Sequence, residues 1–167
     1  MRVLVISDTH LGAATLPRMP AAVWAMAEQA DVVLHAGDVV DGAVLAALAE
    51  RATVHAVLGN NDHGLAGQLP ETIELELGGV RIGMIHDSGA RAGRERRMAR
   101  RFPEAQVVVF GHSHEPLVQP VDGGPLLVNP GSPTQRRRQP LHTVAWLEVA
   151  DGHITVAEIR GVGPLAG

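Results

Sequence analysis

The sequence of 167 residues contains no cysteine, no lysine and no tyrosine, and it has only two Trp and two Phe. Without cysteine, disulfides, thiolate catalysis and cysteine-rich zinc cages are excluded, so oxygen and nitrogen ligands must hold any bound metal. Without lysine, a Schiff-base lysine and the lysine of a P-loop are excluded. Because aromatic residues are scarce, aliphatic side chains must fill the interior.

Charge and hydropathy exclude further classes. A net charge of −4 and a pI near 6.1 do not favour nucleic acid as a stable partner, since that binding requires a basic surface. No apolar run approaches the ~20 residues of a membrane span, and the N-terminal run meets Asp8 too early for a signal peptide. We expect a cytoplasmic protein with no membrane partner, and the sequence leaves homo-oligomer formation open.

The hydrophobic pattern predicts one α/β domain over residues 1–160, followed by a flexible tail at 161–167. Short apolar strands alternate with helical segments in the first third, which is typical of a parallel sheet with helices on its faces. The second half is richer in strands and includes a hairpin around Gly78 and Gly79. The expected strands are 3–6, 32–35, 54–58, 72–77, 80–85, 107–110, 126–128, 143–149 and 154–159, and the expected helices are 20–29, 44–51 and a short one within 91–101.

Polar clusters follow the first three predicted strands, at Ser7 to His10, Ala36 to Asp38 and Gly59 to Asp62. The carboxyl ends of parallel strands meet at one edge of a sheet, where open α/β sheets bind ligands. Asp-x-His and His-x-His pairs recur among these polar residues, and residues two apart on an extended segment project to the same side. The glycines that precede Asp38, Asn60 and His112 suit sharp turns with positive φ or close backbone approach.

The candidate ligands combine carboxylate, imidazole and amide groups, which suit Mn²⁺, Fe²⁺ or Zn²⁺. Seven ligands exceed one four-coordinate site and suit two divalent ions that share a bridging carboxylate. Asp38 is the natural bridge, because it has two oxygens and lies between the other motifs. Manganese is favoured, with iron, zinc and nickel as alternatives. The ligands are Asp8, His10, Asp38, Asn60, His86, His112 and His114.

These motifs closely resemble those of the calcineurin-like metallophosphoesterase superfamily, particularly its small YfcE-like phosphodiesterases. The resemblance rests on Ser7-Asp8-Thr9-His10, Gly37-Asp38, Gly59-Asn60-x-Asp62, His86, Gly111-His112-Ser113-His114 and Asn129-Pro130-Gly131-Ser132, in the order of the family. It implies a four-layer α/β/β/α sandwich with two mixed sheets flanked by helices. It also implies one metal on Asp8, His10, Asp38 and His114, and the other on Asp38, Asn60, His86 and His112.

The implied activity is hydrolysis of a small phosphate ester, with a diester favoured, by attack of a metal-bound hydroxide. Asp38, Asn60 and His86 are then catalytic as well as ligands, and Asn61 and Arg136 are candidate substrate contacts. Asn61 stands where many members have a histidine that is thought to protonate the leaving group. An amide cannot be a general acid, although His63 is nearby and is a candidate substitute.

Two other functions stay open at this level: a non-catalytic protein-binding scaffold on the same fold, as in the retromer subunit, and a dinuclear hydrolase of non-phosphate bonds. Asp87 either orients a ligand imidazole or is solvated. The arginines from Arg91 to Arg101 are interpreted as a solvated helix face, and Arg136 to Arg138 as a substrate or structural phosphate contact. Four isolated histidines are interpreted as structural or surface groups, with an outer contact to the centre left open for the first: His35, His55, His142 and His153.

Overall fold

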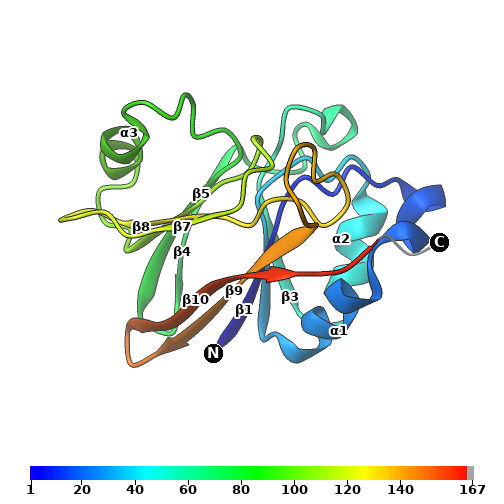
Figure 1. The fold of residues 1–167 in the computed structure, drawn as a ribbon, viewed down its shortest axis with the longest axis horizontal. Helices are drawn as coiled ribbons and strands as arrows, with labels where there is room; N and C mark the ends of the chain where they lie inside the picture. The colour runs from blue at the N-terminus through cyan, green and yellow to red at the C-terminus, as the bar shows by residue number, and fades with distance from the viewer. Residues whose placement is uncertain (165–167) are drawn as a thin grey trace.

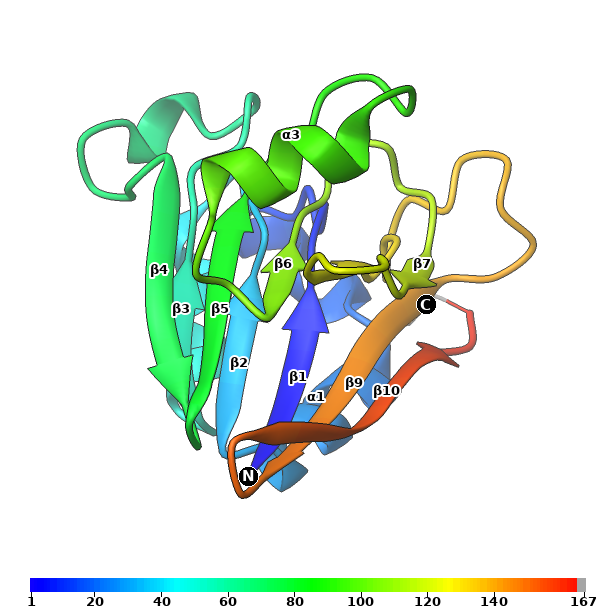
Figure 2. The ribbon, with the colours of Figure 1, turned by 90° about the vertical axis from the view of Figure 1, so that its left-hand side faces the viewer.

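The computed structural model describes residues 1–164, which form two five-stranded sheets packed against each other (Figures 1 and 2). The first sheet has the strand order β10-β9-β1-β2-β3. Strands β1, β2 and β3 are parallel, whereas β9 pairs antiparallel with both β1 and β10. The strands of this first sheet are β1 (Arg2–Ile6), β2 (Val32–His35), β3 (Thr53–Ala56), β9 (Thr143–Ala150) and β10 (His153–Gly161).

The second sheet has the order β4-β5-β6-β8-β7 and is also mixed. Strands β4 and β5 form the predicted hairpin, and β5, β6 and β8 run parallel. Its strands are β4 (Thr72–Leu77), β5 (Val80–Ile85), β6 (Val107–Val109), β7 (Leu117–Gln119) and β8 (Leu126–Asn129).

Three hydrophobic clusters separate four layers. Apolar residues of both sheets, such as Val5 of β1 and Met84 of β5, form the central cluster between the sheets. Helices α1 (Ala21–Gln29) and α2 (Gly42–Ala49) cover the outer face of the first sheet, and α3 (Arg94–Arg101) covers the second. The predicted α/β/β/α sandwich of two mixed sheets with flanking helices is therefore confirmed.

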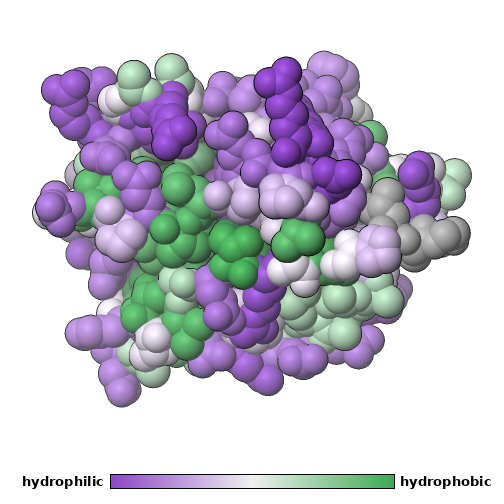
Figure 3. Space-filling view, in the orientation of Figure 1, coloured by the Kyte–Doolittle hydropathy of each residue, from purple (hydrophilic) through white to green (hydrophobic). Residues whose placement is uncertain are grey.

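Alternating side chains explain how one strand serves two layers. Val3 and Val5 of β1 face the central cluster, whereas Leu4 and Ile6 face the helices, and all four are fully buried. The edge strand β7 of the second sheet lies close to the edge strand β10 of the first sheet. Hydrophobic surface is visible in this region within a largely hydrophilic face (Figure 3).

Several elements differ from the sequence prediction. Strand β7 and the 3₁₀ helices η1 (Ala13–Arg18) and η2 (His63–Leu65) were not predicted, because such short segments carry no periodic pattern. Strand β10 extends to Gly161, which pairs with Thr143, and Val162 is buried and donates its N–H to the carbonyl of His142. The expected tail therefore begins within ordered structure, and residues 165–167 lie outside the described residues. No helix within residues 1–164 is long and apolar enough to cross a bilayer.

Candidate metal centre

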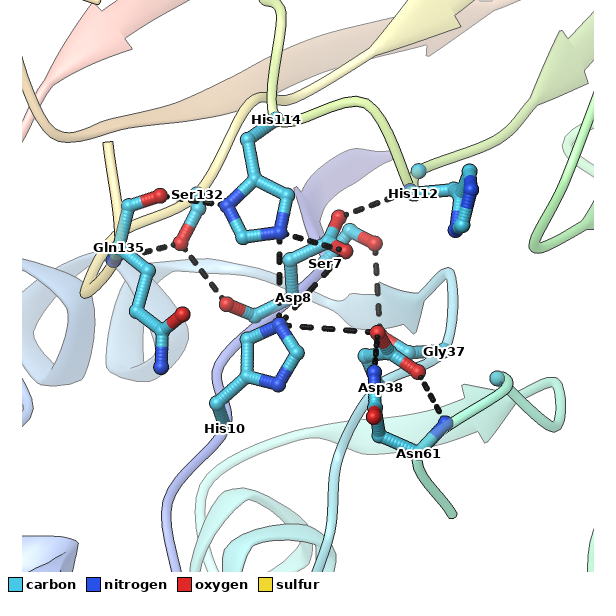
Figure 4. Close-up of polar contacts among 12 residues, drawn as sticks. Ser7, Asp8, His10, Gly37, Asp38, Asn61, His112, His114, Ser132 and Gln135 are labelled. Atoms are coloured by element: carbon cyan, nitrogen blue, oxygen red, sulfur yellow. Dashed lines mark hydrogen bonds and ion pairs between the residues drawn. The ribbon is translucent and has the colours of Figure 1, made fainter. Parts of the chain in front are cut away.

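Loops from five strands bring the predicted ligands together. Asp8, His10, Asp38, His112 and His114 are labelled in Figure 4. The loops follow the carboxyl ends of β1, β2, β3, β5 and β6, and each ligand lies within a few residues of the end of its strand. Asp8, Asp38, His86 and His114 are buried, whereas Asn60 and His112 are exposed. The centre therefore has a closed floor and one side open to solvent.

Asp8, His10 and His114 form the first group of converging atoms. His114 Nε2 lies 3.2 Å from Asp8 Oδ1, and His10 Nε2 lies 3.9 Å from the same oxygen. The two Nε2 atoms are 3.4 Å apart. His10 Nε2 is also 3.6 Å from Asp38 Oδ2, which extends the group toward the loop after β2.

His86, Asn60 and His112 form the second group, on the other side of Asp38. His86 Nε2 lies 3.4 Å from Asp38 Oδ1 and 3.0 Å from Asn60 Oδ1. Asn60 Oδ1 also lies 2.8 Å from His112 Nδ1. The structure thus brings all seven predicted ligands into two adjoining groups with Asp38 between them.

The backbone of the ligand loops shows that the physical reason given for the Asp-x-His and His-x-His pairs was wrong. These pairs are not extended: φ is 55° at Asp8, 46° at His10, 66° at His112 and 59° at His114. Asp38 also has a positive φ, of 55°. Non-glycine residues rarely adopt this left-handed conformation, which costs of order 1–3 kcal/mol each and is concentrated at functional sites. Consecutive tight turns, rather than strand alternation, direct the side chains inward.

The three glycines before ligands act as predicted, by two different means. Gly37 has a φ of 90°. Gly59 and Gly111 instead allow close packing, because a Cβ at Gly59 would lie 2.1 Å from the backbone nitrogen of Asp38, and one at Gly111 would lie 1.9 Å from Ser7 Oγ. Neither distance is compatible with a side chain, so both loops require glycine.

Comparison with known proteins identifies the family. The calcineurin-like phosphoesterase superfamily domain matches residues 1–152. The chain belongs to this superfamily. A probable metallophosphoesterase of Methanocaldococcus jannaschii is 36% identical over 154 residues, which cover 90% of this chain and 77% of the relative. The protein is accordingly a member of a metal-dependent phosphoesterase family, as its motifs predicted.

Two solved structures show how widely the fold is shared. Vps29 of Chaetomium thermophilum superposes with a TM-score of 0.79 at 17% identity, covering 96% of this chain and 95% of its own. An archaeal phosphodiesterase superposes with a TM-score of 0.72 at 22% identity, covering 96% of this chain and 100% of its own. At these identities the likeness shows the fold alone.

In this phosphoesterase, backbone carbonyls fix two of the ligand imidazoles. His86 Nδ1 lies 2.7 Å from the carbonyl oxygen of Ala36, and His114 Nδ1 contacts the carbonyl oxygen of Gln135. An Nδ1–H that donates to a carbonyl leaves Nε2 as the ligand atom, and in both residues Nε2 faces the centre. The tautomer of these two histidines is therefore set by the surrounding backbone.

The segment after β8 supports the first ligand loop. Ser132 Oγ donates to the carbonyl of Asp8 at 2.8 Å, and Thr134 Oγ1 donates to the carbonyl of Thr9 at 2.6 Å. Asn129 Nδ2 donates to the carbonyl of Gly111 at 3.0 Å. The Asn-Pro-Gly-Ser turn was interpreted from the sequence as a tight loop, and the structure shows that it also holds the backbone of two ligand loops.

Electrostatics keep both central carboxylates ionised. Burial raises the pKa of Asp38, but a hydrogen bond from His86, which carries a proton on Nε2 when no metal is bound there, and hydrogen bonds from Asn61 outweigh burial and hold that pKa well below its ordinary value. The pKa of Asp8 is also lowered, since the effects of His114 and Ser7 exceed that of burial. Two negative charges thus face the histidine nitrogens.

The two predicted substrate contacts have partners within the protein. Asn61 donates its backbone N–H to Asp38 Oδ1 at 2.8 Å and its side-chain amide to Oδ2 at 2.6 Å, so it orients that carboxylate. The guanidinium of Arg136 donates to the carbonyl of Gln139 in its own loop at 2.6 Å.

The pKa of His10 is lowered, and burial is the main cause. The carboxylates of Asp38 and Asp8 raise this pKa, whereas the charges of His114 and Arg137 lower it further. Within the Arg136 to Arg138 run, the charge of Arg137 thus acts on His10.

Other sequence interpretations are also resolved. Asp87 is exposed and accepts the N–H of Gly89 at 2.7 Å, so it completes a turn instead of orienting His86. His35 is fully buried, its Nε2 is 3.1 Å from Thr9 Oγ1, and burial lowers its pKa to about 4, so it is a neutral support of the first ligand loop. Arg97 is structural, because its guanidinium donates to the carbonyls of Ser88, Ala90 and Ala92.

Asp62 connects two ligand loops, a role that the sequence did not reveal. It is buried, and its carboxylate accepts the N–H of Val40 at 2.6 Å and the N–H of Gly59 at 2.7 Å. Val40 has a φ of 78°, which is rare for a β-branched residue, so the loop after Asp38 depends on such a contact. The signal was present in the Gly59-Asn60-x-Asp62 motif, but local sequence does not indicate which N–H groups an aspartate accepts.

We expect Asp62→Ala to lower the free energy of unfolding of the metal-free protein by roughly 2–4 kcal/mol, because the buried N–H of Gly59 and the part-buried N–H of Val40 lose a charged acceptor. Urea unfolding in the presence of a chelator measures this difference. Asp87→Ala is the matched control, since it removes an exposed acceptor of one N–H and is expected to change stability by less than about 1 kcal/mol. Equal stabilities of the two variants would contradict the bridging role of Asp62.

Proposed function

We propose that this chain is a dinuclear phosphodiesterase that hydrolyses a small phosphate ester. The first metal site consists of side chains from the loops after β1, β2 and β6, and the second of side chains from the loops after β2, β3, β5 and β6. The ligands are Asp8, His10, Asp38 and His114 for the first site, and Asp38, Asn60, His86 and His112 for the second.

The two oxygens of Asp38 carry this proposal. Oδ2 lies 3.6 Å from His10 Nε2, in the first group, and Oδ1 lies 3.4 Å from His86 Nε2, in the second. A carboxylate that directs one oxygen to each of two histidine groups is placed to bridge two cations. Asn61 holds this carboxylate through both of its N–H donors, which fixes the direction of each oxygen.

Two further observations support the binding of divalent metals by these residues. Asp8 Oδ1 is buried and has no hydrogen-bond partner within residues 1–164, although two imidazole nitrogens lie within 3.9 Å. A buried carboxylate oxygen without a donor is costly unless a cation completes it. The mixture of carboxylate, imidazole and amide oxygen suits manganese, iron or zinc.

When bound, two divalent cations supply Lewis acidity toward the phosphoryl oxygens and lower the pKa of a coordinated water. The chain's own residues position that chemistry. The low pKa values of Asp8 and Asp38 keep both carboxylates charged, and the carbonyls of Ala36 and Gln135 keep the Nε2 atoms of His86 and His114 directed inward. Asn61 and His112 lie on the exposed side, from which the ester would enter.

Two observations favour a diester with an acidic leaving alcohol. Asn61 occupies the position next to Asn60 and donates to Asp38, so it supplies no acidic proton to a leaving group. The archaeal phosphodiesterase shows that the same fold can carry this activity. Restriction to good leaving groups follows from the missing proton donor.

A protein-binding scaffold is the competing function, because Vps29, a vacuolar protein sorting protein, has the same fold. The complete and converging ligand set favours hydrolysis. A panel of an aryl phosphodiester, an aryl phosphomonoester, a cyclic nucleotide and a carboxylic ester, each with Mn²⁺, tests the proposal. We expect the aryl diester to be the best substrate. Hydrolysis of none of them by metal-loaded protein would favour the scaffold.

We expect two divalent ions per chain after loading with Mn²⁺ and desalting, and loss of activity on treatment with a chelator. Elemental analysis against protein concentration gives the stoichiometry. The prediction rests on seven converging ligands, where one site requires about four. A fully loaded sample with one ion per chain would rule out the dinuclear centre. His153→Ala, which removes an exposed histidine at the start of β10, serves as the control for metal lost through handling.

A further inference from the structure

A small cleft adjoins the metal centre on the side of His10 and is not required by the ligand set. Its volume is about 120 Å³, well below the roughly 300–1,000 Å³ of a site for a whole ligand. It therefore has room for one small substituent. The lining residues are Thr9, His10, Leu11, Thr15, Arg18, Thr134 and Gln135.

Arg18 gives this cleft its charge. Among the residues of 1–164 that line it, Arg18 is the one arginine and no residue is acidic. The part of the chain that the structure describes provides no ion pair or hydrogen bond for its guanidinium, whereas Arg2, Arg51, Arg81 and Arg160 have acidic partners. The charge of Arg137 also reaches His10. Arg18 thus contributes a positive charge to a cleft whose lining residues include no carboxylate.

The backbone that carries Arg18 is fixed by its own segment, whereas the Arg18 side chain is exposed. Arg18 ends η1 and is followed by Met19, which is buried and donates its N–H to the carbonyl of Leu16. At the start of η1, Gly12 and Thr15 exchange hydrogen bonds, and Ala13 donates its N–H to Asp41 Oδ2 at 2.9 Å. The arginine is therefore presented by a segment tied to the loop after β2.

The opposite wall of the cleft is equally well anchored. Thr134 is buried and donates its hydroxyl to the carbonyl of Thr9, and Gln135 donates its backbone N–H to Ser132 Oγ at 2.8 Å. In Figure 4, Gln135 lies on one side of His10 and Asp38 on the other. His10 lines the cleft and its Nε2 lies 3.6 Å from Asp38 Oδ2, so a group bound in the cleft would lie beside a side chain that faces the bridging carboxylate.

We propose that this cleft is a substrate subsite in which Arg18 binds a second anionic group, a carboxylate or a phosphate, attached through a short chain to the scissile phosphoryl group. The inference rests on the proposed function, because it requires the phosphoryl group to lie at the metal ligands. Arginine recognises carboxylate and phosphate by paired N–H donors, and a site without acidic residues is suited to an anion.

A matched pair of esters tests the subsite: 4-nitrophenyl 2-carboxyethyl phosphate and 4-nitrophenyl propyl phosphate. They share a leaving group and differ in the anion. We expect the wild type to favour the carboxylate ester at least about tenfold in kcat/KM, and Arg18→Ala to abolish that preference through KM while it retains the rate on the propyl ester. Arg81→Ala, which removes an exposed arginine paired with Glu104, is expected to keep the preference.

Binding without turnover gives a second measurement. Calorimetric titration with 3-phosphonopropionate and propylphosphonate should show tighter binding of the carboxylate compound to the wild type and equal binding of both to Arg18→Ala. Equal kcat/KM for the two esters in the wild type, or an unchanged preference in Arg18→Ala, would overturn the subsite. Hydrolysis of neither ester, with two metals present, would instead overturn the proposed function.

Discussion

Replacing Asp38 by Asn is expected to lower kcat/KM for an aryl phosphodiester by about a thousandfold or more. The change removes a negative charge whose two oxygens face His10 and His86 at 3.6 and 3.4 Å, and it replaces one acceptor oxygen with an NH₂ donor. A shared carboxylate contributes to both cation sites, which together supply several kcal/mol of transition-state stabilisation. Metal content should fall below two ions per chain. Steady-state kinetics and elemental analysis of the same preparation measure both effects.

Asp87→Asn is the matched control, because Asp87 is adjacent to the ligand His86 but is exposed and accepts only the N–H of Gly89. We expect it to retain activity within about threefold, since the neutral amide oxygen can still accept that hydrogen bond. If both variants lost activity equally and both kept two metals, the assignment of Asp38 as the bridge would be incorrect.

The second large effect concerns the leaving group. The Asn61 amide donates to Asp38 and cannot protonate an alcohol, so the rate should rise steeply as the pKa of the leaving alcohol falls. Nitrophenyl diesters are therefore expected to react far faster than alkyl diesters at the same metal concentration. Asn61→His should selectively increase the rate for poor leaving groups, by roughly 10²–10⁴-fold where protonation limits the reaction.

The interpretation of this variant depends on metal content, because Asn61 also orients Asp38 through its side chain. The backbone N–H to Asp38 Oδ1 remains in the variant, and elemental analysis should confirm two ions per chain. His63→Ala provides the comparison, since His63 is exposed and begins η2. A wild-type rate independent of leaving-group pKa, with chemistry shown to be rate-limiting by single-turnover measurement, would show that another group such as His63 already supplies the proton.

Much of the fold could be predicted from local pattern. Strands β2, β4 and β5 lie at the predicted residues, because apolar runs bounded by glycine and polar residues have few alternatives. The three α-helices lie within a few residues of their predicted bounds. The order of the proposed metal-binding motifs indicated which loops would meet. Strand β7 was missed because its three half-buried residues, Leu117–Gln119, form a strand only by pairing with β8.

The sequence by itself predicted the chemistry of the proposed centre, since the types, spacing and order of Asp8, His10, Asp38 and the other proposed ligands supply oxygen and nitrogen donors suited to divalent cations. The tertiary structure alone decided how those ligands are held. Ser132 supports the carbonyl of Asp8 from 124 residues away, and Asp62 accepts the N–H of Val40 from 22 residues away. Contacts from side chain to backbone across such separations leave no local pattern, because any backbone N–H or carbonyl is a suitable partner. For the same reason the cleft beside His10 could not be predicted, since Arg18 and Gln135 meet there only when the chain is folded.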